Sequence, residues 1–153
     1  MLEKALILAA KVHTGQVDKG GAPYILHPIR VMLACEGEKE KIVALLHDTL
    51  EDTALTAADL RRAGFPEEIV QAVCCLTRGQ KEDYMDYIAR ICENALAARV
   101  KYADLQDNLD IRRIPNPTER DFARIRKYEQ AMKRITRSIK GGREHGALDT
   151  GEL

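Results

Sequence analysis

The stretch Ile42-Val-Ala-Leu-Leu-His-Asp-Thr-Leu-Glu-Asp52 (residues 42–52) decides how the rest of the chain is interpreted. Its first five residues are all apolar, and they lead directly into His47-Asp48. A helix that is apolar on nearly every side is buried on nearly every side. The pattern therefore predicts a buried central helix over residues 40–50 with an unusually acidic end.

That acidic end holds three carboxylates, those of Asp48, Glu51 and Asp52, within five residues. The C-terminal end of a helix is the negative pole of the helix dipole, so these charges need a positive counterpart. If the helix continues, His47 and Glu51 lie four residues apart, as do Asp48 and Asp52, and the two pairs form neighbouring columns. This arrangement predicts a metal ion at the level of His47, with a catalytic acid pair one turn further on.

Helical spacing of apolar residues continues on both sides of this segment, and no stretch alternates with period two for long enough to form a sheet. Gly, Pro and Thr residues mark the helix ends. The chain is therefore predicted to be an all-α domain, a single helical bundle of about eight helices. The other expected helices are residues 2–13, Pro28 to near Gly37, 56–63, 66–76, 81–93, 95–111, and a long final helix from Thr118.

Length and composition restrict the classes of protein to which the chain can belong. A length of 153 residues suits one domain, predicted here over residues 1–140, and the Gly-rich residues 141–153 are expected to form a flexible C-terminal tail. The 24 Lys and Arg residues balance the 24 Asp and Glu residues, which argues against a nucleic-acid partner. No apolar run approaches the roughly 20 residues that a membrane span needs. We expect a cytoplasmic protein without a membrane or nucleic-acid partner, and homo-oligomerisation is left open.

The four cysteines predict no site. They form no CxxC pair, so they suit neither a zinc knuckle nor a disulfide framework. Their neighbours are apolar, which is typical of free cysteines that pack as small hydrophobic residues. The residues concerned are Cys35, Cys74, Cys75 and Cys92.

A metal centre at His47 and Asp48 needs ligands from elsewhere in the chain. The best candidates are His27, which prolines frame at the end of a Gly-rich loop, and Asp104, which lies among apolar residues. A set of two imidazoles and two carboxylates suits Mn²⁺ or Fe²⁺ and leaves positions for water and a phosphate oxygen. Zn²⁺ and Mg²⁺ are less favoured.

Simpler interpretations of the same residues stay open at this point. Taken alone, His27 could be a hydrogen-bonded core histidine, and Asp104 could be the partner of Lys101. Glu51 and Asp52 could be the first acids of a following turn capped by Thr53. His13, on the inner face of the first helix, is interpreted as structural.

Four separated blocks of sequence resemble a known family. In chain order they are His13-x-Gly-Gln, Gly21-x-Pro-Tyr-x-x-His-Pro, His47-Asp-x-x-Glu-Asp and Ala103-Asp-x-x-x-Asn-Leu. Their order and spacing resemble the HD-domain metal-dependent phosphohydrolases, specifically the hydrolase domain of RelA/SpoT proteins and the small alarmone hydrolases. The resemblance runs from the first helix to about Tyr128. It implies hydrolysis of the 3′-pyrophosphate of guanosine alarmones, (p)ppGpp, to pyrophosphate and GDP or GTP.

The resemblance also implies roles for individual residues. The metal ligands would be His27, His47, Asp48 and Asp104, holding one Mn²⁺. Glu51 and Asp52 match the acid pair that orients and activates the attacking water. The residues that would contact the nucleotide substrate are Lys19, Asn108, Arg124 and Tyr128.

The loop before the second helix departs from the family pattern. Alarmone hydrolases usually have Arg-Lys there, with the arginine stacked on guanine, whereas this chain has Asp18-Lys19. A carboxylate cannot stack as a guanidinium does. A phosphohydrolase acting on another nucleotide, for example ppApp, therefore stays open. A non-catalytic nucleotide-binding domain is the other alternative.

Overall fold

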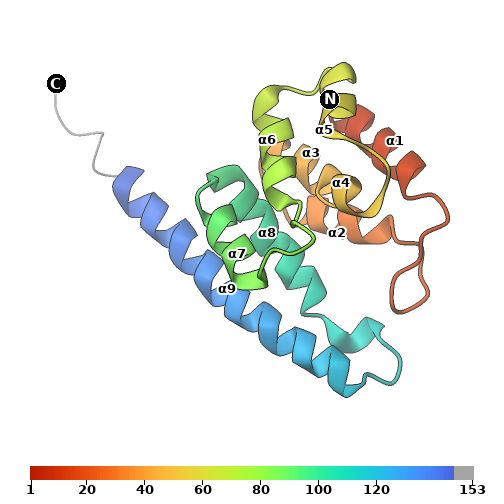
Figure 1. The fold of residues 1–153 in the computed structure, drawn as a ribbon, viewed down its shortest axis with the longest axis vertical. Helices are drawn as coiled ribbons and strands as arrows, with labels where there is room; N and C mark the ends of the chain where they lie inside the picture. The colour runs from red at the N-terminus through yellow and green to blue at the C-terminus, as the bar shows by residue number, and fades with distance from the viewer. Residues whose placement is uncertain (147–153) are drawn as a thin grey trace.

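The computed structural model describes residues 1–146, which fold into helices joined by short loops, with one isolated β-bridge between Val17 and Pro23. The all-α prediction is confirmed (Figure 1). The helices are α1 (Leu2–Val12), α2 (Leu26–Leu33), α3 (Glu38–Leu46), α4 (Thr49–Asp52), α5 (Ala57–Arg62), α6 (Glu67–Leu76), α7 (Tyr84–Cys92), α8 (Ala95–Asn108), the 3-10 helix η1 (Ile111–Arg113) and α9 (Glu119–Gly146).

Helices α3 and α8 form the centre of the bundle. The apolar run from Ile42 to Leu46 in α3 is buried throughout, and α3 packs against α1, α2, α6 and α8. Helix α9 lies along α8 and α7, and its C-terminal end extends beyond the other helices (Figure 1). Helices from the first part and from the end of the chain therefore both pack against α8.

Side-chain caps set several helix boundaries. Thr56 begins α5 with a capping box, because its hydroxyl accepts from the Asp59 N–H while the Asp59 carboxylate accepts from the Thr56 N–H. The Asp83 carboxylate accepts from the Met85 and Asp86 N–H groups. Helix α7 therefore begins at Tyr84, later than the predicted residue 81.

The central helix predicted over residues 40–50 is interrupted at His47-Asp48. Helix α3 ends at Leu46, and the short helix α4 begins at Thr49. His47 Nδ1 donates to the Ala44 carbonyl at 2.5 Å, and the Thr49 hydroxyl donates to the Leu46 carbonyl at 2.7 Å. Such side-chain bonds compete with the backbone ladder of a helix and open a turn there. The prediction of one unbroken helix is wrong.

The long final helix continues past the predicted end of the domain. Helix α9 includes residues 141–146, the first six residues of the segment predicted to be a flexible tail, and the division into domain and tail stays a prediction. The remaining predicted tail, residues 147–153, lies outside the described part of the chain. Across residues 1–146, no helix combines the length and the apolar character that membrane crossing demands.

Candidate metal centre and active-site pocket

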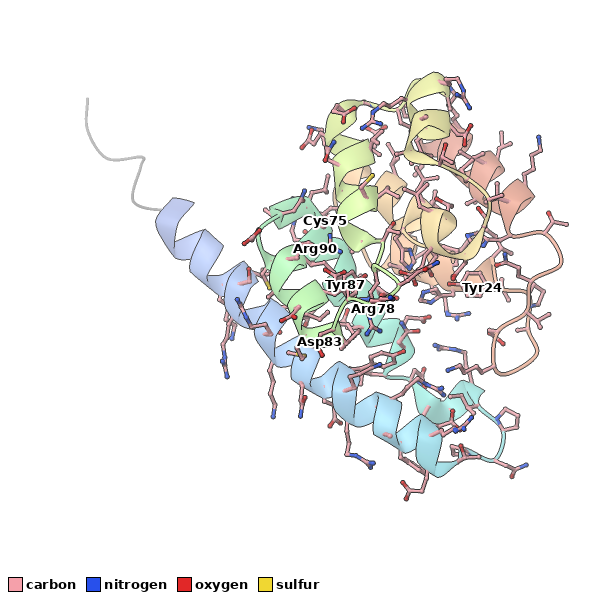
Figure 2. All side chains as sticks on the ribbon, viewed as in Figure 1. Tyr24, Cys75, Arg78, Asp83, Tyr87 and Arg90 are labelled. Atoms are coloured by element: carbon pink, nitrogen blue, oxygen red, sulfur yellow. The ribbon has the colours of Figure 1, made fainter. Side chains whose placement is uncertain are left out.

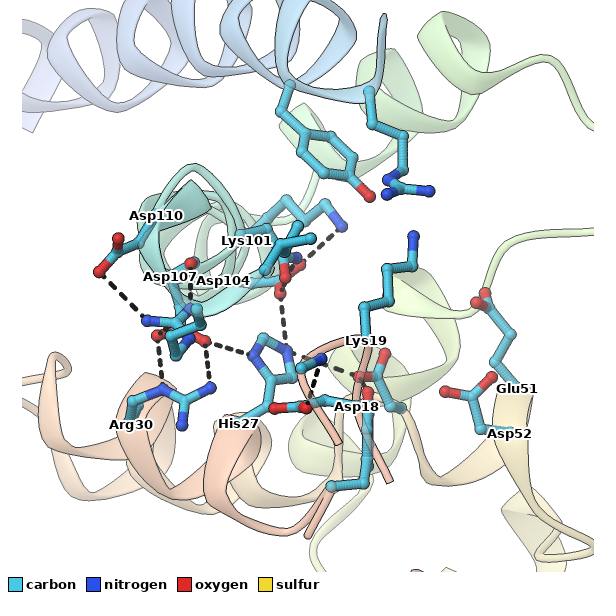
Figure 3. A pocket seen from close by; sticks show the side chains of 18 of the residues that line it. Asp18, Lys19, His27, Arg30, Glu51, Asp52, Lys101, Asp104, Asp107 and Asp110 are labelled. Carbon is cyan, nitrogen blue, oxygen red and sulfur yellow. Dashed lines mark hydrogen bonds and ion pairs between the residues drawn. The ribbon is translucent and has the colours of Figure 1, made fainter. Parts of the chain in front are cut away.

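A cavity of about 620 Å³ opens beside α8, where the loop after α1 approaches α9. Its walls come from α2, α4, the loop between α6 and α7, α8, η1 and α9 (Figure 3). Every predicted site residue except His47 lines this cavity. His47 lies directly behind the lining, with its Nε2 atom 3.3 Å from Nε2 of His27.

Three predicted metal ligands present their donor atoms to one another. They are His27 near the start of α2, His47 at the end of α3, and Asp104 in α8. Asp104 Oδ1 lies 3.0 Å from His27 Nε2 and 3.6 Å from His47 Nε2. All three donor atoms lie within 4.8 Å of one another, which suits ligands about 2.0–2.2 Å from a shared ion.

Asp48 faces the same centre from the turn between α3 and α4. Its Oδ2 atom lies 3.0 Å from His47 Nε2 and 3.7 Å from His27 Nε2. The hydroxyl of Tyr24 donates a hydrogen bond to the same oxygen. The interruption of the central helix thus places Asp48 beside His47.

The Nδ1 atoms of His27 and His47 each have a hydrogen-bond partner in the protein. His47 Nδ1 bonds the Ala44 carbonyl, which can only accept, so this nitrogen carries the proton. His27 Nδ1 donates to Asp107 Oδ2 at 2.7 Å. In its neutral form, each imidazole therefore presents an unprotonated Nε2 to the centre, as metal-ligating histidines do.

The donor set fits a divalent cation. Two Nε2 lone pairs only 3.3 Å apart repel each other unless a proton or a metal lies between them. Burial by itself would lower the pKa of both histidines, but the Asp48, Asp104 and Asp107 carboxylates outweigh it and raise both values. The carboxylates thus favour a positive charge in this buried position, and a bound divalent ion would supply it.

Asp104 has two roles in the same carboxylate. Its Oδ2 atom accepts from the buried Lys101 ammonium at 2.7 Å, and its Oδ1 atom accepts from the Asn108 amide at 2.9 Å. Burial opposes ionisation of Asp104, but Lys101 and the two histidines hold its pKa well below the usual range. The partner of Lys101 and the candidate ligand are therefore one residue, and the two interpretations do not compete.

The acid pair lies at the edge of the cavity, in the short helix α4. Glu51 Oε1 accepts from the main-chain N–H of Arg78 at 2.7 Å, and Figure 3 shows Glu51 and Asp52 next to each other. Burial, Asp48 and Glu51 together raise the pKa of Asp52. The Thr53 hydroxyl donates to the Thr49 carbonyl at 2.6 Å and accepts from the Leu55 N–H at 3.1 Å, and the next helix, α5, begins only at Ala57. The acids belong to the pocket and not to a following helix.

Cationic and aromatic side chains form the opposite wall of the cavity. The predicted substrate residues Lys19, Arg124 and Tyr128 all line it, and Arg124 pairs with Asp121. Burial lowers the pKa of Lys19, and the positive charge of Arg124 lowers it further. This wall, made by the loop after α1 and by α9, gives the cavity a positive side facing a negative one.

Comparisons with known proteins bear on this site. No family model matches the chain. A protein from Myxococcus xanthus named GTP pyrophosphokinase is 31% identical over 144 residues, which are 82% of this chain and 18% of that protein. The guanosine-3′,5′-bis(diphosphate) 3′-pyrophosphohydrolase of Aquifex aeolicus is 32% identical over 120 residues, which are 71% of this chain and 17% of that protein. The chain spans less than a fifth of the length of these curated relatives.

A solved structure extends the likeness to the fold. It belongs to a metazoan orthologue of SpoT described as hydrolysing ppGpp, and it matches with a TM-score of 0.71 at 26% identity. The match covers 92% of this chain and 85% of that chain. The chain is a RelA/SpoT hydrolase-like HD domain.

Two supporting residues of this HD domain were not singled out from the sequence. The Asp107 carboxylate accepts from His27 Nδ1 and from Arg30 Nε at 2.7 Å, and it forms an ion pair with Arg113 Nη2 at 3.2 Å. Hydrogen bonds from His27 and Arg30 overcome the effect of burial and lower the pKa of Asp107 to about 2. The other residue is Tyr24, the hydrogen-bond donor to Asp48. Tyr24 could have been predicted from its place in the Pro-Tyr-x-x-His-Pro block. Asp107 could have been predicted because it lies about one helical turn after Asp104.

The HD domain uses Asp18 to shape its own loop. Asp18 Oδ1 accepts from the N–H groups of Gly20 and Ala22, each at 2.9 Å. The neighbouring Gly20 approaches η1 so closely that a Cβ atom would lie 2.4 Å from the Arg113 carbonyl oxygen. One oxygen of Asp18 therefore stabilises the conformation of this loop. Only glycine fits at position 20, because a side chain there would clash with η1.

Proposed function

We propose that this HD domain hydrolyses the 3′-pyrophosphate of (p)ppGpp-type alarmones and releases pyrophosphate and GDP or GTP. The convergence of His27, His47 and Asp104 donor atoms beside the acid pair carries this proposal. Asp48 completes the ligand set. The relative from Aquifex aeolicus is named for this reaction, and the metazoan orthologue of SpoT is described as hydrolysing ppGpp.

The carboxylates of Glu51 and Asp52 supply the base for this reaction. A divalent ion held by the four ligands would lower the pKa of water from about 16 toward about 7 and would polarise the phosphoryl group. Glu51 is fixed by its bond to the Arg78 N–H, and the raised pKa of Asp52 makes its carboxylate a stronger base than an ordinary aspartate. An oxygen–phosphorus bond forms to water as the bond between phosphorus and the ribose 3′-oxygen breaks. The 3′-oxygen leaves with a proton.

The positive wall binds the polyanionic substrate. Lys19 and Arg124 face the phosphates from the loop after α1 and from α9, and Tyr128 lies beside Arg124 on the same helix. The family resemblance implies that Asn108 lies near the ribose, and its amide donates a hydrogen bond to Asp104. Asn108 would thereby link the ribose end of the substrate to the metal ligands. Charge-assisted hydrogen bonds of this kind orient a phosphate as well as attract it.

The metal is proposed to be Mn²⁺. Two imidazoles with two carboxylates mix ligands of intermediate and hard character, which suits Mn²⁺ or Fe²⁺ better than the oxygen-rich sites of Mg²⁺. Metal analysis of the purified protein, followed by reconstitution of metal-free protein with each ion in turn, tests this proposal.

A second candidate substrate is an alarmone with another base, such as ppApp. Asp18 favours this alternative, because its carboxylate shapes the loop in which the family usually places a stacking arginine. Without that arginine, the loop contributes no guanidinium plane to hold guanine in preference to adenine.

Substrate profiling with Mn²⁺-loaded protein decides between these substrates. The protein is offered ppGpp, pppGpp, ppApp, GTP and ATP, and pyrophosphate release is measured. We expect release from the 3′-pyrophosphorylated nucleotides alone. Activity confined to GTP and ATP, or binding without any turnover, would contradict the proposed reaction, and equal rates on ppGpp and ppApp would favour the base-tolerant alternative.

A further inference from the structure

Arg78 is the pocket residue whose position is most closely tied to the acid pair. It lies in the loop between α6 and α7, and its main-chain N–H donates to Glu51 Oε1 at 2.7 Å. Figure 2 shows Arg78 in this loop, between α6 and α7. Any movement of this loop therefore moves Glu51 and Arg78 together.

The charge of the Arg78 guanidinium is not neutralised by the protein. Its Nε donates to the Glu82 carbonyl at 2.9 Å, and its Cζ lies 5.3 Å from the centre of the Tyr84 ring. Among the side chains that the structure describes, no carboxylate lies within ion-pair distance of it, and its two terminal nitrogens have no hydrogen bond. The backbone bond and the ring fix the direction of the guanidinium while these donors stay available.

Lys127 brings a second unneutralised cation to the same ring. Its Nζ lies 4.4 Å from the centre of the Tyr84 ring, and it too has no ion pair among the described side chains. Burial lowers the pKa of Lys127, and the positive charges of Arg78, Arg124 and Lys101 lower it further. Like charges gathered in a partly buried wall repel one another, and an anion bound between them would relieve that cost.

We propose that Arg78 binds the pyrophosphate group, with Lys127 beside it, at the end of the cavity occupied by Glu51. This inference rests on the proposed function and adds a substrate contact to it. A planar guanidinium offers two parallel N–H donors to a phosphoryl group, and the ammonium of Lys127 adds a second positive charge. Because Glu51 is bonded to the Arg78 main chain, the group that activates water and the group that binds phosphate keep a fixed spacing.

Binding of inorganic pyrophosphate tests the proposal without requiring turnover. Mn²⁺-loaded protein, dialysed free of excess metal, is titrated with pyrophosphate and separately with GDP by calorimetry. We expect Arg78→Ala to weaken pyrophosphate binding about tenfold or more, as loss of hydrogen bonds to a charged group does. Arg78→Lys keeps the charge without the paired donors and should restore part of the affinity.

The controls separate a binding role from a structural one. Arg62→Ala removes an exposed arginine of α5 that pairs with Asp59 outside the pocket, and it should leave pyrophosphate binding unchanged. Lys127→Ala lies on another helix and should also weaken pyrophosphate binding, so the test survives if Arg78→Ala does not fold. Unchanged pyrophosphate affinity in folded Arg78→Ala overturns the proposal.

The two ligands also separate this proposal from the proposed function. If Arg78→Ala weakens GDP binding but not pyrophosphate binding, Arg78 contacts the 5′-diphosphate and the proposal is wrong. If pyrophosphate binding depends on Arg78 while the wild-type protein hydrolyses no 3′-pyrophosphorylated nucleotide, the anion site is supported and the proposed function fails.

Discussion

The two walls of the cavity are built in opposite ways. On the metal side, His27, His47 and Asp104 are buried, and each is held by a second protein group. On the phosphate side, Arg78 and Lys127 keep positive charges without a carboxylate partner among the described side chains. The contrast teaches that the protein organises the donor atoms of the proposed metal side in advance, whereas it leaves two cations of the proposed phosphate side for a ligand to neutralise.

Removing a ligand from the metal side should have the largest effect. Asp48→Ala takes away a carboxylate 3.0 Å from His47 Nε2 and leaves Tyr24 without its acceptor. Loss of the ion removes several kcal/mol of transition-state stabilisation, so we expect activity to fall by at least about 10³-fold. Metal content by mass spectrometry should fall with it.

The matched control for this change is Asp86→Ala, which removes an exposed carboxylate of α7 that does not line the cavity. It should keep both metal and activity. If Asp48→Ala keeps its metal, then Asp48 is not a ligand, and the metal side consists of the three residues whose donor atoms converge most closely.

Glu51→Gln should separate catalysis from metal binding. Glutamine can still accept from the Arg78 N–H through its carbonyl oxygen, but it cannot take a proton from water. We expect kcat to fall about 10²-fold to 10⁴-fold with the metal retained. Glu68→Gln, at an exposed position of α6, is the control, and full activity of Glu51→Gln would refute its role as base.

A change on the phosphate side should affect substrate binding more than metal content. Arg124→Ala removes a cation of α9 that lines the cavity and pairs with Asp121. We expect KM to rise about tenfold or more, the usual effect of losing a hydrogen bond to a charged group, with metal content unchanged. Steady-state kinetics and metal analysis on the same preparation check this, and a loss of metal would show that the two walls are not independent.

The sequence predicted the fold class and part of the candidate site, but not the break in the central helix. The apolar run before His47 and the helical spacing around it were enough for the all-α fold, and the motifs with the family resemblance identified part of the cavity lining. The break after Leu46 was missed, because it depends on the side chains of His47 and Thr49 taking main-chain carbonyls. Periodicity reports which residues are apolar and carries no information on such local competition.

Contacts between residues far apart in the sequence were also not predicted. Asp107 is separated from His27 by 80 residues, and Arg78 from Glu51 by 27. Arg78 contacts Glu51 through its main-chain N–H. Every residue type except proline has this group, so the identity of residue 78 could not predict the bond. The unneutralised charges of Arg78 and Lys127 became apparent only when the structure brought both to one tyrosine ring.

The smallest expected effect concerns the loop that carries Arg78. Glu82 accepts from Arg90 at 2.9 Å and from the Gly79 N–H at 3.1 Å, and these bonds lower the pKa of Glu82 from 4.5 to about 2. A lowered folded-state pKa adds stability above about pH 4.5 that is lost as the pH falls toward 2. The difference in Tm between wild type and Glu82→Gln, measured on metal-free protein, should therefore be small at pH 6 and disappear at low pH. A difference that stays constant with pH would mean that the Glu82 charge does not stabilise the loop, whereas a shrinking difference would show that the bonds of the Glu82 carboxylate help to hold the loop that carries Arg78.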